Sequence, residues 1–355
     1  MTSIITNAYA VHFNATGYEE LNKYLRNNRF SKIFIIVDNH THVHCLPHFM
    51  AKLETDLECE IIEIEAGEAN KNIDTCVGVW NALSELGADR KSLIINVGGG
   101  VVTDLGGFVA CTFKRGLKYI NVPTSLLAMV DASVGGKTGV DLAALKNQVG
   151  VISSGDMVLV DTSFLNTLPQ NQLKSGLAEM LKHGLIYDAH YWNKFLDLNS
   201  LDLNDLDDLI HQSIQIKNTI VTEDPFEQGV RKTLNFGHTL GHAIESYFLS
   251  EPDKQELLHG EAIAIGMIME TYISVELLAF PKADLEIIKE TFLKIFSKIS
   301  IASSDYGAII KLLKYDKKNE HGNINFVLLE NIGVPKIDCL VENELLIEAF
   351  EYYKS

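Results

Sequence analysis

The chain has 355 residues, enough for two domains at about 150 residues each. Its 46% hydrophobic and 22% charged residues are ordinary globular usage and exclude a disordered chain. Lys and Arg number 30 against 47 Asp and Glu, and the net charge of -17 opposes binding to nucleic acids and anionic membranes. We therefore expect a folded protein with neither kind of partner.

The cysteines and the first residues indicate the compartment. The five cysteines contain no Cys-x-x-Cys pair, so neither a disulfide framework nor a cysteine zinc site is expected. The opening MTSIITNAYAVHF has no basic stretch before an apolar run, and no uncharged apolar run reaches the roughly 18 residues of a membrane helix. These features predict a cytoplasmic protein with neither a signal peptide nor a membrane anchor.

The hydrophobic pattern divides the chain in two. Up to residue 161, helical patterns such as 71–87 alternate with short β-rich runs at 32–38, 59–65, 92–100, 118–123 and 157–161. This alternation predicts an α/β domain, 1–161, with a parallel sheet covered by helices. Residues 162–355 form a mostly helical second domain, with one strand at 323–330 and helices at 170–186, 201–222, 227–249, 255–277 and 283–298. A ligand is expected in a cleft at the domain junction.

A glycine-rich turn follows the third predicted strand. The segment Asn96–Asp104 reads NVGGGVVTD, so the strand ends in three glycines and leads into a helix. Glycines there let the backbone approach a pyrophosphate, whose charge the helix N-terminus favours. Thr103 breaks the G-x-G-x-x-G spacing, so a simple tight turn remains an alternative. Gly67 and Glu68 with Lys71 either bind a ribose or adenine or begin an ordinary helix.

A second glycine loop, DASVGGKTG, covers 131–139. A nucleotide-hydrolysing P-loop would need glycine at 131, where Asp131 stands, so this class is disfavoured. Lys137 on a glycine-rich turn, followed by Lys146 and Asn147, provides donors suited to phosphate. A flexible loop without ligand is the alternative.

Four polar residues in the second half are spaced like one face of a helix. Arg231, Asn235, His238 and His242 follow one another at intervals of four, three and four. Two histidines at i and i+4 are a known metal-binding geometry. A structural role remains the alternative for any one histidine, but four polar residues on one stripe need partners.

Further residues complete the expected centre. His259 offers another nitrogen, and Glu179 is the candidate carboxylate because an unpaired charge mid-helix between small and apolar residues would be costly. Lys217 adds a cation. The run 316–318 adds two more, for which a solvated surface is the alternative.

Together these motifs resemble those of the 3-dehydroquinate synthase family of sugar phosphate cyclases. The resemblance runs from about residue 66 to 330 and rests on the order of its blocks: GGGVVTDLGGF, TFKRG, VPTSLLAMVDASVGGKTG, LKNQVG, FLNTLP, GLAEMLKHG, EQGVRKTLNFGHTLGHAIE, HGEAIAIGM and DKKNEHG. It implies a Rossmann-like NAD domain, a helical metal-binding domain and a homodimer. It also implies the conversion of 3-deoxy-D-arabino-heptulosonate 7-phosphate to 3-dehydroquinate and phosphate in the shikimate pathway.

The resemblance assigns roles by position in this chain. It makes Glu179, His238 and His259 the ligands of zinc or cobalt, and it turns His242 from a ligand into a contact of the substrate phosphate. The other implied phosphate contacts are Lys137, Asn147, Asn235, one of Lys317 and Lys318, and Arg115 reaching across the dimer.

Carboxylate, hydroxyl and cofactor contacts are assigned in the same way. The resemblance assigns Lys217 and Arg231 as contacts of the substrate carboxylate. It assigns Asp131, Lys182 and Glu227 as contacts of the reacting hydroxyls. Lys146 lies near both cofactor and substrate. The implied NAD contacts are Glu68, Lys71, Gly99, Gly100, Asp104, Thr124, Ser125 and Thr167. Three positions depart from the family pattern, namely Thr103, Ser125 and Pro225, and we expect Thr103 to tighten the first glycine loop.

Three other functions remain possible. A glycerol or iron-dependent alcohol dehydrogenase would share the fold and a metal-bound alcohol, but it would not need the phosphate and carboxylate cations together. Cyclases that make inosose or valiolone rings lack a substrate carboxylate, and Lys217 and Arg231 argue for one. A non-catalytic NAD-binding module would be expected to have lost a ligand or a cation, and this chain has kept them.

Overall fold

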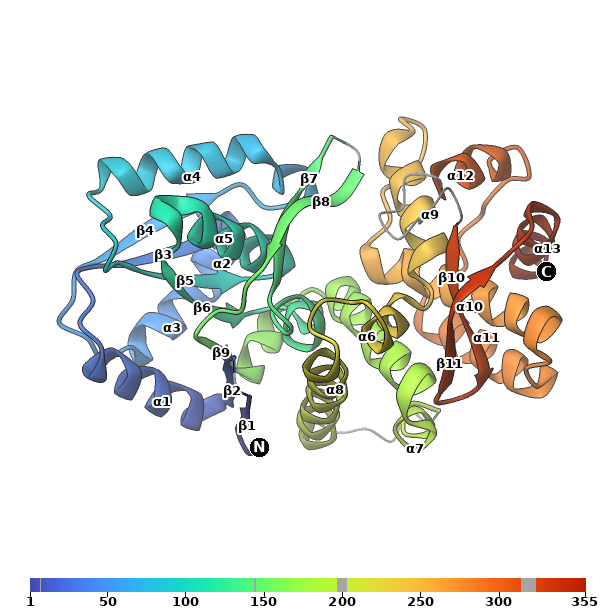
Figure 1. The fold of residues 1–355 in the computed structure, drawn as a ribbon, viewed down its shortest axis with the longest axis horizontal. Coiled ribbons are helices and arrows are strands. Elements are labelled where there is room, and N and C mark those ends of the chain that lie inside the picture. Colours follow the sequence, from blue (N-terminus) through green and yellow to red (C-terminus); the bar gives the residue numbers. More distant parts are fainter. Residues whose placement is uncertain (7, 144, 197–202, 314–323) are drawn as a thin grey trace. The chain divides into compact units, whose positions relative to one another are not determined.

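The computed structural model describes residues 1–355 apart from 7, 144, 197–202 and 314–323 (Figure 1). It divides into two compact units, Met1–Leu173 and Lys174–Ser355. Within the described ranges, no helix is both long and apolar enough to cross a membrane.

The first unit is built on a seven-stranded sheet. In spatial order the strands are β1 (Ile4–Ile5), β2 (Ala10–Phe13), β9 (Met157–Val160), β6 (Lys118–Pro123), β5 (Leu93–Gly98), β3 (Ile33–Asp38) and β4 (Cys59–Ile64). Only β1 runs antiparallel to its neighbour. The predicted parallel sheet is thus confirmed, and each of its five predicted strands is present. The short β1 and β2 were not predicted.

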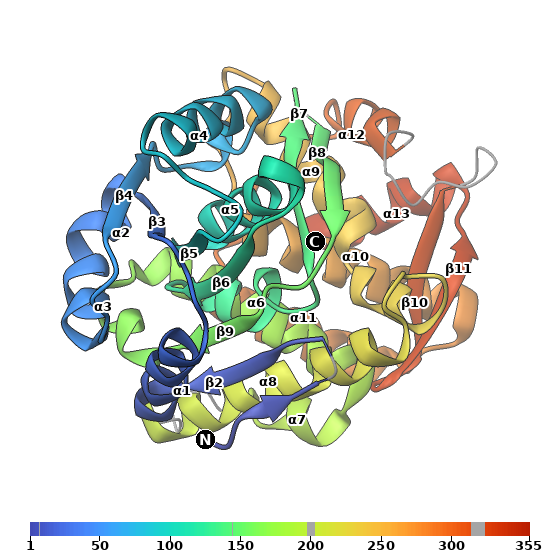
Figure 2. The ribbon, with the colours of Figure 1, turned by 60° about the vertical axis from the view of Figure 1, so that its left-hand side comes forward.

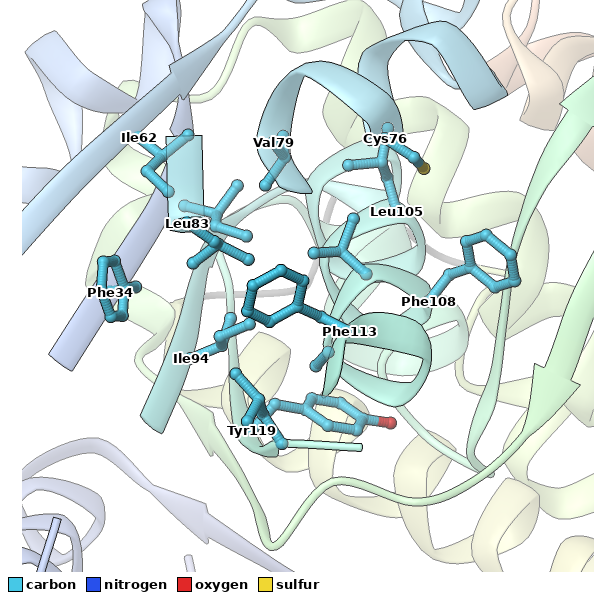
Figure 3. Close-up of a cluster of buried hydrophobic side chains, with 14 of the residues drawn as sticks. Phe34, Ile62, Cys76, Val79, Leu83, Ile94, Leu105, Phe108, Phe113 and Tyr119 are labelled. Carbon is cyan, nitrogen blue, oxygen red and sulfur yellow. The ribbon is translucent and has the colours of Figure 1, made fainter. Parts of the chain in front are cut away.

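Helices cover both faces of this sheet. Figures 1 and 2 show α4 (Ile73–Glu85) on one side and α1 (Asn14–Asn27) on the other. On the α4 side, side chains of α4 and α5 (Gly100–Thr112) pack with those of the strands into one apolar cluster, which includes Phe34, Leu83, Ile94 and Leu105 (Figure 3). Burial on both faces explains why β3 is apolar from Ile33 to Val37 rather than alternating. Strand β5 is interrupted only by Asn96, whose Nδ2 donates to Asn121 Oδ1 of β6 at 2.8 Å.

The strand order creates a switch point between β3 and β5. The chain passes from β3 to β4 on one side, then crosses back to β5 and continues to β6 on the other side. The carboxyl ends of β3 and β5 therefore lead into helices that diverge. A ligand of an open α/β sheet binds in the crevice at such a point.

The second glycine loop leads into a hairpin that the sequence analysis missed. Strand β7 (Lys137–Leu142) pairs antiparallel with β8 (Leu145–Ile152). The expectation of Lys137 on a turn was therefore wrong, because Lys137 begins β7, and Lys146 and Asn147 lie in β8. The two strands approach closely at glycines, since a Cβ on Gly139 would lie 2.6 Å from the carbonyl oxygen of Val149.

The second unit is mostly helical, as predicted. Its elements are α6 (Gln170–Tyr187), α7 (Ala189–Asn193), α8 (Leu203–Glu223), η6 (Val230–Asn235), α9 (His238–Ser250), α10 (His259–Leu278), α11 (Lys282–Ile295), α12 (Tyr306–Leu312), β10 (Asn325–Asn331), β11 (Val334–Leu340) and α13 (Asn343–Lys354). Strand β10 corresponds to the predicted 323–330, and its antiparallel partner β11 was not predicted.

The predicted helix 227–249 is interrupted. Arg231 and Asn235 lie on the 3-10 helix η6, whereas His238 and His242 lie on α9. Between them Gly237 is left-handed at φ +77°. The prediction that all four polar residues line one helix was wrong, because the chain turns at Gly237.

Asp161 ties two helices of the first unit to the end of β9. Its Oδ2 accepts hydrogen bonds from Tyr18 at 2.9 Å and Lys52 at 3.1 Å, and His48 Nε2 lies 2.9 Å away. Burial would raise the pKa of Asp161, but the hydrogen bonds, led by that from Ser163, lower it to about 2. The ionised carboxylate therefore stabilises the fold.

We predict that Asp161→Asn lowers the free energy of unfolding by about 2 kcal/mol at pH 7. Since the folded pKa is depressed, this contribution is complete above about pH 4 and disappears as the pH falls toward about 2. Urea unfolding of both proteins between pH 7 and pH 2 measures the difference.

Asp156→Asn is the matched control, because Asp156 pairs with the exposed Lys118 at 2.7 Å and such pairs contribute less than about 1 kcal/mol. Equal unfolding midpoints for wild type and Asp161→Asn at pH 7 would contradict the prediction.

Candidate active site

The glycine turn lies at the switch point of the sheet. Gly99 caps α5 in an extended conformation, and the N–H of Thr124 donates to the carbonyl of Gly98 at 3.0 Å. A Cβ on Gly99 would lie 3.3 Å from Ser125 Oγ. The turn is therefore packed against the residues that follow β6, and the N-terminus of α5 provides N–H groups and a dipole suited to an anion.

Thr103 braces this turn from the first turn of α5. Its Oγ1 lies 3.2 Å from the carbonyl oxygen of Gly99 and 3.3 Å from that of Gly100, and it donates toward both. Such bonds from a threonine to the preceding turn are common in helices, so the tightening expected from Thr103 stays a prediction.

A buried lysine joins three segments of the first unit. Lys71 Nζ donates to Asp104 Oδ2 at 2.5 Å and to Asn147 Oδ1 at 2.7 Å, and Glu68 Oε1 lies 3.9 Å away. Burial would lower the pKa of Lys71, but the carboxylates of Asp104 and Glu68 outweigh it and raise that pKa. Residues that were assigned separately to cofactor and phosphate thus form one network.

Asp141 organises the hairpin side of this network. Its Oδ1 accepts the N–H of Asn147 at 2.6 Å, and its Oδ2 lies 3.4 Å from Lys146 Nζ. Lys146 Nζ also lies 3.0 Å from Glu68 Oε1. Asn147 is left-handed at φ +51°, a conformation that this contact supports. The sequence analysis missed Asp141, because the hairpin that brings it to Asn147 was itself not predicted.

The remaining candidates of the first unit lie on other elements. Asp131 is in a π-helical turn (Ala128–Ala132), and Lys137 lines a small pocket with Ser133 and Ser154. Arg115 is exposed and left-handed at φ +72°. Thr167 Oγ1 donates to the carbonyl of Phe164 at 3.1 Å.

Asp38 is a further candidate at the switch point. It is the last residue of β3, and its carboxylate accepts the N–H of Thr41 at 2.7 Å in a capping box. An acidic residue at the end of such a strand is suited to hydroxyl groups of a ribose. The sequence contained an indication of this role, because Asp38 is the last residue of the predicted strand 32–38.

In the second unit, Glu179 lies between two imidazoles. Its side chain is completely buried in α6, and its Oε1 lies 3.4 Å from His238 Nε2 and 3.6 Å from His259 Nε2. Lys182, one turn later, contacts the other carboxylate oxygen. One carboxylate and two imidazole nitrogens around a common point are a donor set that zinc takes, so these residues fit a divalent metal.

Close packing brings His259 to Glu179. The N–H of Gly260 donates to Ser175 Oγ at 2.9 Å, and a Cβ on Gly260 would lie 2.2 Å from the carbonyl oxygen of Ser175. The start of α10 therefore rests on the backbone of α6 one turn before Glu179. Only glycine at 260 permits this approach.

Each histidine is held through its other nitrogen. His238 Nδ1 lies 3.1 Å from the carbonyl oxygen of Phe236, and His259 Nδ1 lies 3.3 Å from Glu245 Oε2. Burial would lower the pKa of His259, but Glu245 and then Glu179 raise it to about 10. The negative charge of Glu245 and Glu179 also favours binding of a metal cation. Groups that contact the second ring nitrogen, as Glu245 does, orient histidines that bind metals. Glu245 was not assigned a role, although it follows His238 by seven residues on one helix face.

His242 completes a group of three histidines. The ligand atoms of His238, His242 and His259 all lie within 4.8 Å of one another. The geometry therefore admits both interpretations made from the sequence, with His242 as a ligand or as a neighbour of the ligands.

Asp224 shapes the loop that carries Glu227 and Arg231. Its carboxylate accepts the N–H groups of Gln228 at 3.0 Å, Gly229 at 2.7 Å and Arg231 at 3.0 Å. Burial raises the pKa of Asp224, but these bonds outweigh it and lower that pKa.

The side chains of this loop are held as well. Arg231 is buried, and its Nη1 donates to the carbonyl of Pro225 at 2.7 Å. Asn235 Nδ2 donates to Glu227 Oε1 at 2.9 Å, with Glu227 left-handed at φ +59°. Lys217 is buried in α8, whereas Lys317 and Lys318 lie outside the described residues.

A Rossmann-like unit with a glycine turn, followed by a helical unit with a glutamate–histidine cluster, is the architecture of the sugar phosphate cyclases. A 2-deoxy-scyllo-inosose synthase, solved with carbaglucose-6-phosphate, NAD+ and Co2+, is 28% identical, with a TM-score of 0.83 over 99% of this chain and 100% of that chain. A 2-epi-5-epi-valiolone synthase from Streptomyces hygroscopicus subsp. jinggangensis 5008 shares the fold at a TM-score of 0.87 and 24% identity, over 100% of this chain and 99% of that chain.

The sequence comparisons define the family. The domain described as 3-dehydroquinate synthase N-terminal matches residues 61–175, and the one described as 3-dehydroquinate synthase C-terminal matches 176–319. The 3-dehydroquinate synthase of Parabacteroides distasonis is 41% identical over 94% of this chain and 95% of its own length. The chain belongs to the 3-dehydroquinate synthase family.

We predict that Asp224→Asn speeds amide hydrogen exchange at Gln228, Gly229 and Arg231 roughly tenfold, because each loses a charge-assisted acceptor. Exchange followed by mass spectrometry at pH 7 measures this. Asp188→Asn is the control, since Asp188 caps α7 by accepting the N–H of His190 at 2.8 Å. Unchanged exchange in Asp224→Asn would show that its carboxylate does not order the loop.

Proposed function

We propose that this enzyme converts 3-deoxy-D-arabino-heptulosonate 7-phosphate to 3-dehydroquinate and phosphate, as a cytoplasmic homodimer in the shikimate pathway. The observation that carries the proposal is the ordered match of both family domains across residues 61–319, with the Glu179–His238–His259 cluster formed in the structure.

The proposed cofactors are NAD and a divalent metal, zinc or cobalt. Bound NAD supplies a reversible hydride acceptor, and the metal supplies a Lewis acid that lowers the pKa of a substrate hydroxyl. Glu179, His238 and His259 would hold the metal. The residues proposed to hold NAD surround the switch point and its network: Glu68, Lys71, Gly99, Gly100, Asp104, Thr124, Ser125, Lys146 and Thr167.

The two charged ends of the substrate are assigned to different cations. The planar guanidinium of Arg231 suits the carboxylate, and Lys217 adds a point charge; both are buried, which strengthens their attraction. The residues proposed to hold the phosphate are Lys137, Asn147, Asn235, His242 and one of Lys317 and Lys318, with Arg115 reaching from the other protomer. Since charges are screened beyond about 8 Å at physiological salt, this local set outweighs the net charge of -17.

Proton transfer is assigned to groups around the reacting hydroxyls. Lys182, beside Glu179, would donate a hydrogen bond to a substrate oxygen. Asp131 and Glu227 would accept protons from hydroxyls, Glu227 being held at its Oε1 by Asn235. Phosphate elimination needs a proton acceptor beside the scissile bond, and we propose that the departing phosphate itself fills this role.

The direct test mixes pure protein, the heptulosonate phosphate, NAD and zinc, and follows phosphate and dehydroquinate together. We expect equal amounts of both products, a requirement for NAD, and no net reduction of it, because the hydride returns within each cycle. NADH accumulating in proportion to product would instead indicate a dehydrogenase. Equal turnover of a phosphate lacking the carboxylate would indicate another cyclase.

We predict that chelation abolishes activity and that zinc or cobalt restores it. His259→Ala should lose the metal, whereas His242→Ala should keep it and lose turnover, since His242 is proposed to face the phosphate. Metal analysis and kcat of the purified variants measure both effects. Stoichiometric metal loss from His242→Ala would make the i, i+4 histidine pair the ligand set.

We predict opposite substrate preferences for Arg231→Ala and Lys137→Ala. Loss of one partner from a desolvated ion pair costs roughly 3 to 5 kcal/mol, at least a hundredfold in binding. Arg231→Ala should therefore impair the natural substrate far more than an analogue without the carboxylate. Lys137→Ala should weaken binding of the natural substrate and of the analogue without the carboxylate to the same extent. It should weaken binding of an analogue without the phosphate only a little. Inhibition constants of the analogues provide the measurement, and equal losses on every analogue would contradict the assignment.

A further inference from the structure

Glu270 is a completely buried carboxylate in the middle of α10. Its Oε2 accepts the N–H of Gly237 at 2.6 Å, and its Oε1 accepts the N–H of Leu240 at 3.2 Å. These two N–H groups lie on either side of His238, the first residue of α9. Glu270 therefore holds the peptide around a proposed metal ligand from a different helix.

The cap that Glu270 supplies is one that α9 cannot make for itself. Gly237 stands at the N-cap without a side chain, and the first turn of α9 has no acidic residue. A capping side chain at 237 is excluded, because φ is +77° and a Cβ would lie 2.3 Å from Met267 Cγ. The first N–H groups of a helix need acceptors, so the acceptor has to come from α10.

A second contact on α10 fixes the same turn. A Cβ on Gly266, one helical turn before Glu270, would lie 2.0 Å from the carbonyl oxygen of Gly237 and 2.8 Å from the nitrogen of Gly241. The backbone of α9 thus rests directly on α10. Gly266 sets the distance between them, and Glu270 sets the rotation of the turn.

The same helix begins with His259. Helix α10 therefore carries His259, one of the two proposed imidazole ligands, at its start. The same helix contacts the turn that carries the other, His238. The ring of His238 follows that turn, since its Nδ1 lies 3.1 Å from the carbonyl oxygen of Phe236. Movement of the turn relative to α10 would move His238 Nε2 away from Glu179.

We propose that Glu270 is a positioning residue of the metal centre, which fixes His238 relative to His259 through the N–H groups of Gly237 and Leu240. This inference rests on the metal site proposed above. A carboxylate suits the task because it offers one oxygen to each N–H. A glutamine would present its amide N–H₂ to one of them and lose that bond.

Cobalt binding to metal-free protein tests the inference without measuring activity. Chelator-treated wild type, Glu270→Gln and Thr271→Val are titrated with Co2+, and affinity and visible absorption are recorded. Thr271 is the matched control, because it is equally buried on α10 and its Oγ1 donates within α10, to the carbonyl of Met267 at 2.6 Å. We expect Glu270→Gln to bind Co2+ about 10- to 100-fold more weakly with an altered spectrum. Thr271→Val should lower the melting temperature alone.

The outcomes separate the inference from the proposed function. Wild-type affinity and spectrum in Glu270→Gln would overturn the positioning role while leaving the metal site in place. If wild type bound Co2+ no more tightly than His238→Ala, the proposal of the metal site itself would be contradicted. Should Glu270→Gln not fold, Glu270→Asp keeps a carboxylate and is expected to show the same weakening. If neither variant folded, Glu270 would be a determinant of folding and the inference would be wrong.

Discussion

The second unit is organised around a carboxylate that has no access to water. An isolated ionised carboxylate is costly to bury, so its surroundings must provide positive charge or protons. Around Glu179 they do so from three helices, through Lys182 on α6, His238 on α9 and His259 on α10. The glycines at 237, 260 and 266 follow from this requirement, because helices that bring these side chains together must touch at their backbones.

The first unit contains a buried charge of the opposite sign, the ammonium group of Lys71. Lys71 is buried, and its ammonium group is compensated by Asp104 and Glu68. Because these partners come from a turn after β4 and from α5, and Asn147 comes from the β7–β8 hairpin, the network joins the glycine turn to the residues assigned to phosphate. A ligand that contacts one of these groups thereby alters the field at the others. This coupling suits an enzyme whose cofactor and substrate must be bound at the same time.

The sequence predicted those features that depend on local pattern. Strands such as β3 and β5 are buried on both faces, so Ile33–Val37 is an unbroken apolar run, and Leu93–Val97 is apolar apart from Asn96. Such runs cannot be mistaken for surface. The edge strand β1 and its neighbour β2 have two and four residues, too few to show a period. The β7–β8 hairpin was missed because its glycines indicate a loop, whereas they are there to let two backbones meet.

Tertiary contacts explain the remaining differences. The spacing of His238 and His242 is helical and was interpreted correctly for α9, but nothing in the spacing shows that α10 forces a turn at Gly237. Glu270 acts on residues thirty and thirty-three positions earlier in the chain, so no local pattern indicates it. The family resemblance selected three metal ligands from the four candidates that the residues had suggested. The residues alone had already suggested Glu179 and His259 beside the His238–His242 pair, and the resemblance changed only the role of His242.

The central claim is that one buried site formed by Glu179, His238 and His259 holds the metal. Anomalous diffraction at the zinc edge from crystals of the zinc-loaded protein tests it most directly. The account predicts one strong peak about 2.0 to 2.2 Å from a Glu179 oxygen and from the Nε2 atoms of His238 and His259. A peak bound by His238 and His242 without Glu179, or a peak outside this cluster, would contradict it.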